Sequence, residues 1–284
     1  MLDRPRPPHV VAVVAHPGDE VLLHGSALAA AALRGCPVTV VTLTDGEGAA
    51  LPRGALTASL DQLRAAGARR IAQLHQACEV LGGVRWRGAN QGWLQSGIDS
   101  GHVSRWLTRQ DAFALAEVVA VELALLRADV VLTGPEDGAS GHPDHVLVAA
   151  AVRLAVELLR ERGHDAVRLF GLLLPADDVR AARASHGGRR RAAVPDAVVG
   201  HDVELATHVL PDGPWVARRT EALAAYASGR RGRAARDDGW GDGPAAELLV
   251  LAQEVGARRG HAALYREHVA QLLRTVRPQE YLLR

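Results

Sequence analysis

Residues 9–20 read His-Val-Val-Ala-Val-Val-Ala-His-Pro-Gly-Asp-Glu, an apolar run that ends in a polar cluster. The run over 10–15 is rich in β-branched valine, which is typical of a strand buried in a parallel sheet. His16 and Asp19 follow where this strand is expected to end, and α/β folds bind their ligands at that edge of the sheet. The run therefore predicts an α/β fold with a polar site at the end of its first strand.

Strand-like and helix-like segments alternate through the first half of the chain. Strand character is found over 10–15, 37–43, 129–133 and 169–174, and helical character over 21–33, 63–81, 111–127 and 146–162. This alternation favours a Rossmann-like, mostly parallel sheet with helices on both faces. We expect residues 1–175 to form this core and to carry the functional site.

The pattern weakens after Pro175. Residues 215–228 have helical character, and 244–276 predict one or two helices; for the C-terminal portion as a whole, edge strands are the alternative to a lid or cap. Two stretches rich in glycine and arginine, 185–191 and 229–243, predict surface loops. We expect residues 176–284 to form a smaller lid or cap of the same domain that sets substrate specificity.

The composition is that of a globular protein. With 284 residues and 48% hydrophobic side chains the chain can bury a large core, and a net charge of +1 gives no field that attracts nucleic acid or membrane. Two cysteines, Cys36 and Cys78, make no disulfide framework and suit a reducing cytosol. No apolar run reaches the length of a membrane span. We therefore expect a cytoplasmic protein without a nucleic-acid partner or a membrane span, and a homo-oligomer is compatible with the sequence.

A second polar cluster, Gly-His-Pro-Asp-His over 141–145, follows another predicted strand. His16, Asp19 and His145 would together supply two imidazoles and a carboxylate, a ligand set that suits zinc, with iron(II) as an alternative. Asp19 alone would fit an ordinary helix N-cap. Because each cluster follows a predicted strand, we favour one divalent-metal site built from both.

Two further residues of the second cluster have candidate roles beside the metal. His142 can donate a proton to a developing oxyanion or a leaving group. Asp144 can orient an imidazole ligand from behind, or it can form a simple turn with Pro143. The sequence has no Gly-x-Ser-x-Gly elbow and no phosphate-binding loop, so it favours neither acyl-enzyme chemistry nor nucleotide binding.

Both clusters resemble the Ala-His-Pro-Asp-Asp-Glu and His-Pro-Asp-His motifs of the LmbE-like (PIG-L) N-deacetylases. Residues 42–48 resemble the family's loop after its second strand, 70–82 its Arg-x-x-Glu-Leu helix, and 93–97 a segment of its mycothiol-pathway branch. The family members are zinc-dependent hydrolases that remove acetyl groups from substrates of the N-acetylglucosamine type. The resemblance, over about 9–160, implies a deacetylase of an N-acetylated amino-sugar conjugate or a related small molecule.

The resemblance also implies roles for individual residues. His16, Asp19 and His145 correspond to the metal ligands, and His142 corresponds to the imidazole that stabilises the oxyanion or donates a proton. The candidate substrate-binding residues are Arg70, Glu47 and Gln95.

One departure from the family pattern affects the chemistry. Gly18 stands where the family has the aspartate that serves as general base. Glu20, Asp45, Glu47 and Asp144 are candidate replacements, and we favour Asp144 or Glu47 because Glu20 begins a helix. The alternative is a family member without standard deacetylase activity, which would be a binding or regulatory protein or would use its metal for another reaction.

Overall fold

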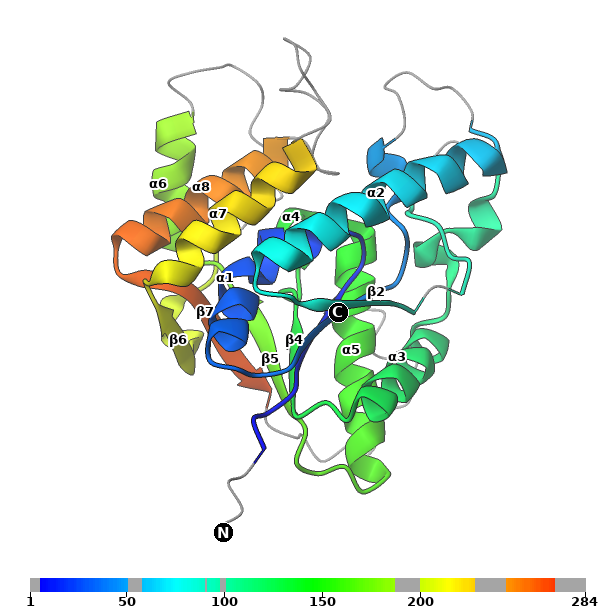
Figure 1. The fold of residues 1–284 in the computed structure, drawn as a ribbon, viewed down its shortest axis with the longest axis horizontal. Coiled ribbons are helices and arrows are strands. Elements are labelled where there is room, and N and C mark those ends of the chain that lie inside the picture. Colours follow the sequence, from blue (N-terminus) through cyan, green and yellow to red (C-terminus); the bar gives the residue numbers. More distant parts are fainter. Residues whose placement is uncertain are drawn as a thin grey trace.

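The described residues form one sheet of seven strands, with strands from both halves of the sequence (Figure 1). The computed structural model describes residues 6–50, 58–89, 91–97, 101–186, 200–227 and 244–268. The strands are β1 (Val10–Val14), β2 (Val38–Thr42), β3 (Arg85–Gly88), β4 (Val130–Thr133), β5 (Arg168–Leu173), β6 (His208–Pro211) and β7 (His261–His268). The helices are α1 (Asp19–Leu33), α2 (Leu60–Val80), α3 (Ala112–Leu126), α4 (Gly138–Gly141), α5 (Pro143–Glu161), α6 (Ala176–His186), α7 (Pro214–Ala227) and α8 (Pro244–Arg258). Among these helices none is both long and apolar enough to cross a membrane.

The sheet is buried on both faces, as the valine-rich run of the first strand predicts. Val11 and Val13 of β1 pack into a core with α3 and α5. Val10, Ala12 and Val14 point the opposite way, into a core with α1, α2, α6, α7 and α8. Because successive side chains of a strand alternate between faces, an unbroken apolar run needs helices on both sides. The predicted α/β class is therefore confirmed.

The strand order is β3-β2-β1-β4-β5-β7-β6, and the first five strands are parallel. From β1 the chain moves outward through β2 to β3, and it then returns to place β4 on the other side of β1 (Figure 1). The carboxyl ends of β1 and β4 thus flank the point where the strand order reverses. Open α/β sheets bind their ligands at such a switch point. Both polar clusters of the sequence follow these two strands.

The second half of the chain completes this sheet. Strand β7 pairs antiparallel with β5, and β6 pairs antiparallel with β7. A helix predicted over 261–268 is therefore wrong, because these residues form β7 between β5 and β6; the edge strand in this portion of the chain is β6. Gly260, with φ of 92°, ends α8, and the side chains of Ala262 and Leu264 then alternate into the core as strand residues do. The sequence pattern also missed β3 and α6. The two predicted basic loops lie mostly outside the described residues.

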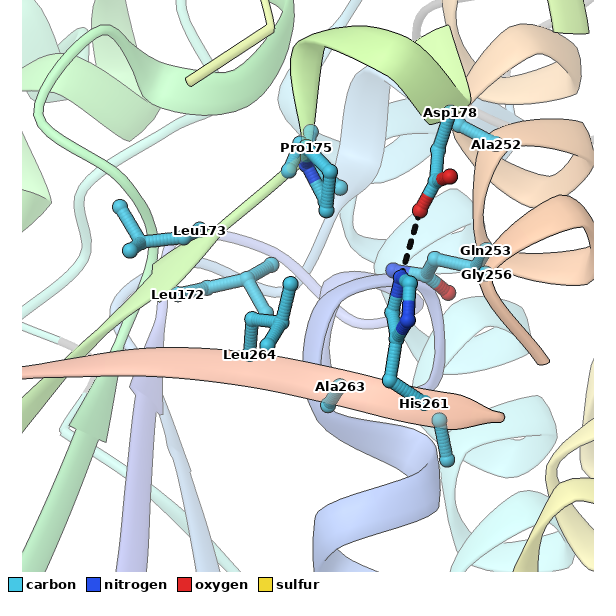
Figure 2. A pocket seen from close by; sticks show the side chains of 12 residues that line it. Leu172, Leu173, Pro175, Asp178, Ala252, Gln253, Gly256, His261, Ala263 and Leu264 are labelled. Atoms are coloured by element: carbon cyan, nitrogen blue, oxygen red, sulfur yellow. Dashed lines mark hydrogen bonds and ion pairs between the residues drawn. The ribbon is translucent and has the colours of Figure 1, made fainter. Parts of the chain in front are cut away.

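Figure 2 shows where these C-terminal elements meet, beyond the end of β5. Asp178 of α6 is only 1% exposed, and its carboxylate lies 2.6 Å from His261 Nε2 and 2.9 Å from Arg259 Nη1. The cavity beside this pair is lined mainly by leucine and alanine and has a volume of about 20 Å³, which is room for about one water molecule. The ion pair therefore ties α6, α8 and β7 together, and the cavity is too small for a larger ligand.

Candidate active site

Two tight turns bring the polar clusters to the switch point. Pro17 and Gly18 separate His16, just past β1, from Asp19 at the start of α1. His142 is the N-cap of α5, and Pro143 occupies its first turn, where a fixed φ and a missing N–H are tolerated. This arrangement places Asp144 and His145 in the first turn of α5, facing the end of β1.

Three side-chain atoms converge between the two turns. Asp19 Oδ2 lies 3.4 Å from His16 Nδ1 and 3.2 Å from His145 Nε2, and these two nitrogens are 3.3 Å apart. Zinc bound to nitrogen and oxygen at about 2.0–2.1 Å in tetrahedral geometry would separate neighbouring ligand atoms by about 3.3–3.4 Å. The near-equilateral triangle therefore fits a single divalent ion.

The remaining nitrogens of both histidines are engaged behind this triangle. His16 Nε2 lies 2.9 Å from Asp144 Oδ2, and His145 Nδ1 lies 3.2 Å from the carbonyl oxygen of Gly138. Each of these nitrogens donates its proton to an oxygen, which directs the other nitrogen toward the shared space. Such outer hydrogen bonds fix the tautomer and the ring orientation of histidine ligands.

Carboxylates dominate the electrostatics of the cluster. Burial favours the neutral form of His16, but hydrogen bonds to Asp144 and Asp19 outweigh it and raise the pKa of His16 to about 10. Burial works against ionised Asp19 as well, yet the charges of His145 and His16 hold the pKa of this carboxyl well below its usual value. The two acids thus stabilise positive charge at the triangle, which is a property expected of a cation site.

His142 lies at the more open side of the cluster. Its ring centroid is 4.8 Å from that of His145 and 5.2 Å from that of His16. Nδ1 of His142 accepts a hydrogen bond from the backbone amide of Asp144 at 3.1 Å, so the neutral ring carries its proton on Nε2. The three imidazoles each offer a nitrogen within 4.8 Å of the others, so His142 is also near enough to contact an ion.

The space that a side chain would occupy at Gly18 is filled. A Cβ atom there would lie 2.7 Å from Arg70 Nη2 and 3.7 Å from Tyr226 Cε1, and the backbone φ of 111° disfavours any residue with a Cβ. Arg70 is held in place by a hydrogen bond from its Nε to the Pro17 carbonyl at 3.0 Å and by stacking on Tyr226. No carboxylate stands at position 18 in this fold.

Glu20 lies behind the same turn. Its Oε2 accepts a hydrogen bond from the Gly18 amide at 2.6 Å, and its Oε1 accepts one from the hydroxyl of Tyr226. The side chain is fully buried. Tyr226 could not be found from the sequence, because it belongs to α7, more than 200 positions along the chain from Glu20, where only a helical pattern is visible.

The other predicted site residues lie around the cluster in different ways. Glu47 and Gln95 are both buried, and the backbone amide of Gln95 donates a hydrogen bond to Glu47 Oε2 at 3.3 Å. The next amide, that of Ser96, donates to Asp144 Oδ2 at 2.8 Å. Arg70 lies beneath Gly18 and is buried, rather than beside His16 and His145.

Comparison with known proteins agrees with the predicted resemblance. Residues 11–156 match the family model PIG-L, described as GlcNAc-PI de-N-acetylase. The chain is 32% identical over 239 residues to 1D-myo-inositol 2-acetamido-2-deoxy-alpha-D-glucopyranoside deacetylase 1 of Saccharopolyspora erythraea, with 78% of this chain and 77% of that protein covered.

Solved structures share the fold at lower identity. N,N'-diacetylchitobiose deacetylase from Pyrococcus horikoshii superposes with a TM-score of 0.57 at 14% identity, covering 93% of this chain and 87% of that one. The 4-carboxy-2-hydroxymuconate hydratase GalB from Pseudomonas putida gives 0.55 at 16% identity, covering 95% and 100%. The family model spans more than half of the sequence, and this chain belongs to the PIG-L family.

Proposed function

We propose that this protein is a zinc-dependent N-deacetylase that hydrolyses the acetamide of an N-acetylated amino sugar. His16, Asp19 and His145 would hold the metal. The observation that carries the proposal is the triangle of their three ligand atoms, with edges of 3.2–3.4 Å. His142 also offers a nitrogen nearby, but we assign it to the substrate because its Nε2 carries a proton in the neutral ring.

A zinc ion at this position would supply Lewis-acid polarisation of the amide carbonyl and would lower the pKa of a nearby water. The chain's own groups supply the rest. Asp144 and the Gly138 carbonyl fix the two ligand imidazoles. We assign the Nε2–H of His142 to donate to the oxygen of the amide carbonyl as negative charge develops there.

The substrate class is proposed from the relatives. The Saccharopolyspora relative is named for an inositol glycoside of N-acetylglucosamine, and the Pyrococcus structure is of a diacetylchitobiose deacetylase. We therefore assign an N-acetylglucosamine-type conjugate, with Glu47 and Gln95 beside the site and Arg70 beneath Gly18 as candidate contacts to it. Residues 176–284 remain candidates for a specificity-setting portion, and the cytoplasmic location stays a prediction.

Metal analysis together with an acetate-release assay tests this function. The purified protein should contain about one divalent ion per chain and should release acetate from 1D-myo-inositol 2-acetamido-2-deoxy-α-D-glucopyranoside. The variant His145→Ala should lose both the metal and the activity. Protein without metal, or acetate release unaffected by His145→Ala, would refute the proposal.

A second candidate is a family member without deacetylase activity, and Gly18 is the observation that favours it. In that case the protein would bind zinc at the same residues but release no acetate from any N-acetylglucosamine conjugate tested. The shared fold of a hydratase is compatible with other reactions on this scaffold. The acetate assay on zinc-loaded protein separates the two candidates.

A further inference from the structure

Hydrolysis of an amide needs a group that takes a proton from the attacking water, and Gly18 offers none. Four buried carboxylates lie around the two histidine turns in the described part of the chain: Asp19, Glu20, Glu47 and Asp144. Their hydrogen bonds differ, and the differences decide which of them can accept a proton.

Asp19 and Asp144 are engaged with the histidines. Asp19 Oδ2 belongs to the triangle and also accepts the His16 amide at 2.9 Å. Asp144 Oδ2 binds His16 Nε2, the nitrogen on the opposite side of the ring from the triangle, and the carboxylate is fully buried. Its Oδ1 is buried without a partner in the described residues. Asp144 therefore orients His16 from behind and does not reach the reacting side.

Glu20 is engaged on the other side of the first turn. Both of its oxygens accept hydrogen bonds, one from the Gly18 amide and one from the Tyr226 hydroxyl. The side chain has no exposed surface. With both oxygens engaged and the side chain buried, Glu20 is assigned a structural role.

Glu47 differs from the other three. It begins a 3₁₀ turn, Glu47–Ala50, after β2. Gly46, the residue just before the turn, packs against the first polar cluster, since a Cβ there would lie 3.0 Å from Pro17 Cδ. Glu47 Oε2 accepts one hydrogen bond, from the Gln95 amide. No other described residue donates to its Oε1, and Glu47 keeps 4% of its surface exposed, whereas Glu20 and Asp144 keep none.

The charges around Glu47 suit a proton acceptor. Burial raises the pKa of its carboxyl, and the nearby charge of Asp45 raises it as well. Hydrogen bonds from the backbone amides of Glu47 and Gln95 lower the pKa, and the charge of His16 lowers it further. A carboxylate with a raised pKa is a stronger base, and general acid–base catalysis is most efficient when this pKa lies near the working pH.

We propose that Glu47, rather than a residue at position 18, accepts the proton of the attacking water; this role rests on the deacetylase function proposed above. As the water oxygen bonds to the amide carbon, one water proton moves to Glu47 Oε1. When the C–N bond breaks, that proton passes to the leaving nitrogen. Amide and water thus give acetic acid and amine, with no further reactant and with Glu47 restored as a carboxylate.

The variant Glu47→Gln tests this role, with Glu79→Gln on the exposed face of α2 as the matched control. Glutamine at position 47 has the same size as glutamate and keeps an oxygen that can accept the hydrogen bond from the backbone amide of Gln95. With 1D-myo-inositol 2-acetamido-2-deoxy-α-D-glucopyranoside as the probe, kcat of Glu47→Gln should fall by about 10²–10⁴-fold. Zinc content should stay close to that of the wild type, and the acidic limb of the kcat/KM pH profile should disappear. Glu79→Gln should match the wild type throughout.

A second readout needs no turnover. Carboxyl ¹³C NMR, assigned by comparison with Glu47→Gln, would follow the Glu47 pKa in metal-free and zinc-loaded protein. A cation beside the carboxyl should lower this pKa by about 1 unit or more. An unchanged pKa, or an active wild type matched by Glu47→Gln in kcat and in pH profile, would overturn the inference alone. A wild type that binds zinc but releases no acetate overturns the deacetylase function itself, and the Glu47 role falls with it.

Discussion

The most specific structural claim concerns Gly18, and the variant Gly18→Ala tests it. Alanine at position 18 would have to adopt the φ of 111° that Gly18 has, and this strained backbone conformation costs about 1–3 kcal/mol of folding free energy. The new Cβ would also lie 2.7 Å from Arg70 Nη2. Arg70 would have to move, and its hydrogen bond to the Pro17 carbonyl is of the charged kind that contributes about 1.5–3 kcal/mol. Together these terms predict a loss of about 2.5–6 kcal/mol in the free energy of unfolding.

Gly35→Ala is the matched control. Gly35 also has a positive φ, 77°, but a Cβ there meets no atom within 4 Å. This variant should therefore lose only the backbone term, about 1–2 kcal/mol. The difference between the two variants contains the contact with Arg70 together with any extra backbone strain at the φ of 111° of Gly18.

Urea unfolding at pH 7, followed by circular dichroism, measures both variants. A chelator keeps metal binding from adding to the stability of the folded state, and equal m values would show that the surface exposed on unfolding is unchanged. If Gly18→Ala loses no more stability than Gly35→Ala, the account of a filled site is refuted. The same strain applies to Gly18→Asp, so we expect this variant not to install a base in an otherwise unchanged fold.

Two further predictions concern the buried polar groups. Asp144→Asn should weaken zinc binding by about 10–100-fold, because His16 loses the carboxylate that orients it; competition with a chromogenic chelator measures this, and an unchanged affinity would contradict it. Burial lowers the pKa of His24 from 6.5 to about 3. Between these pH values His24 is protonated in the unfolded state but not in the folded state, so the folded state loses stability as the pH is lowered. Between pH 7 and pH 4 the loss attributable to His24 is about 3 kcal/mol, and urea unfolding of metal-free His24→Gln should show a flatter pH profile; an identical profile would count against it.

The sequence was informative where one local pattern determines one structural outcome. The valine run of β1 needs apolar cover on both faces, so the parallel sheet and its two helical layers could be predicted. The His clusters could be paired because each follows a strand that ends at the switch point. Both inferences use residues that act through their own backbone position, and the structure brings those residues together as expected.

Other features depend on contacts that no local pattern encodes. Arg70 and Tyr226 fill the space at Gly18 from α2 and α7, and only the packing of these helices brings them there. The strand β7 follows a helix-like segment without a clear break except Gly260, so its place beside β5 comes from the open edge of the sheet. The sequence alone cannot decide between Asp144 and Glu47 as the base; the structure does so because Asp144 bonds to His16 Nε2, the ring nitrogen that faces away from the triangle.

The ligand set of the metal is the central claim, and a crystal structure of the zinc-loaded protein with anomalous scattering at the zinc edge tests it most directly. We predict one zinc ion bonded to His16 Nδ1, Asp19 Oδ2 and His145 Nε2 at about 2.0–2.2 Å, with His142 near the ion but not bonded to it. An ion held by His142 in place of Asp19, or located away from the ends of β1 and β4, would contradict the account.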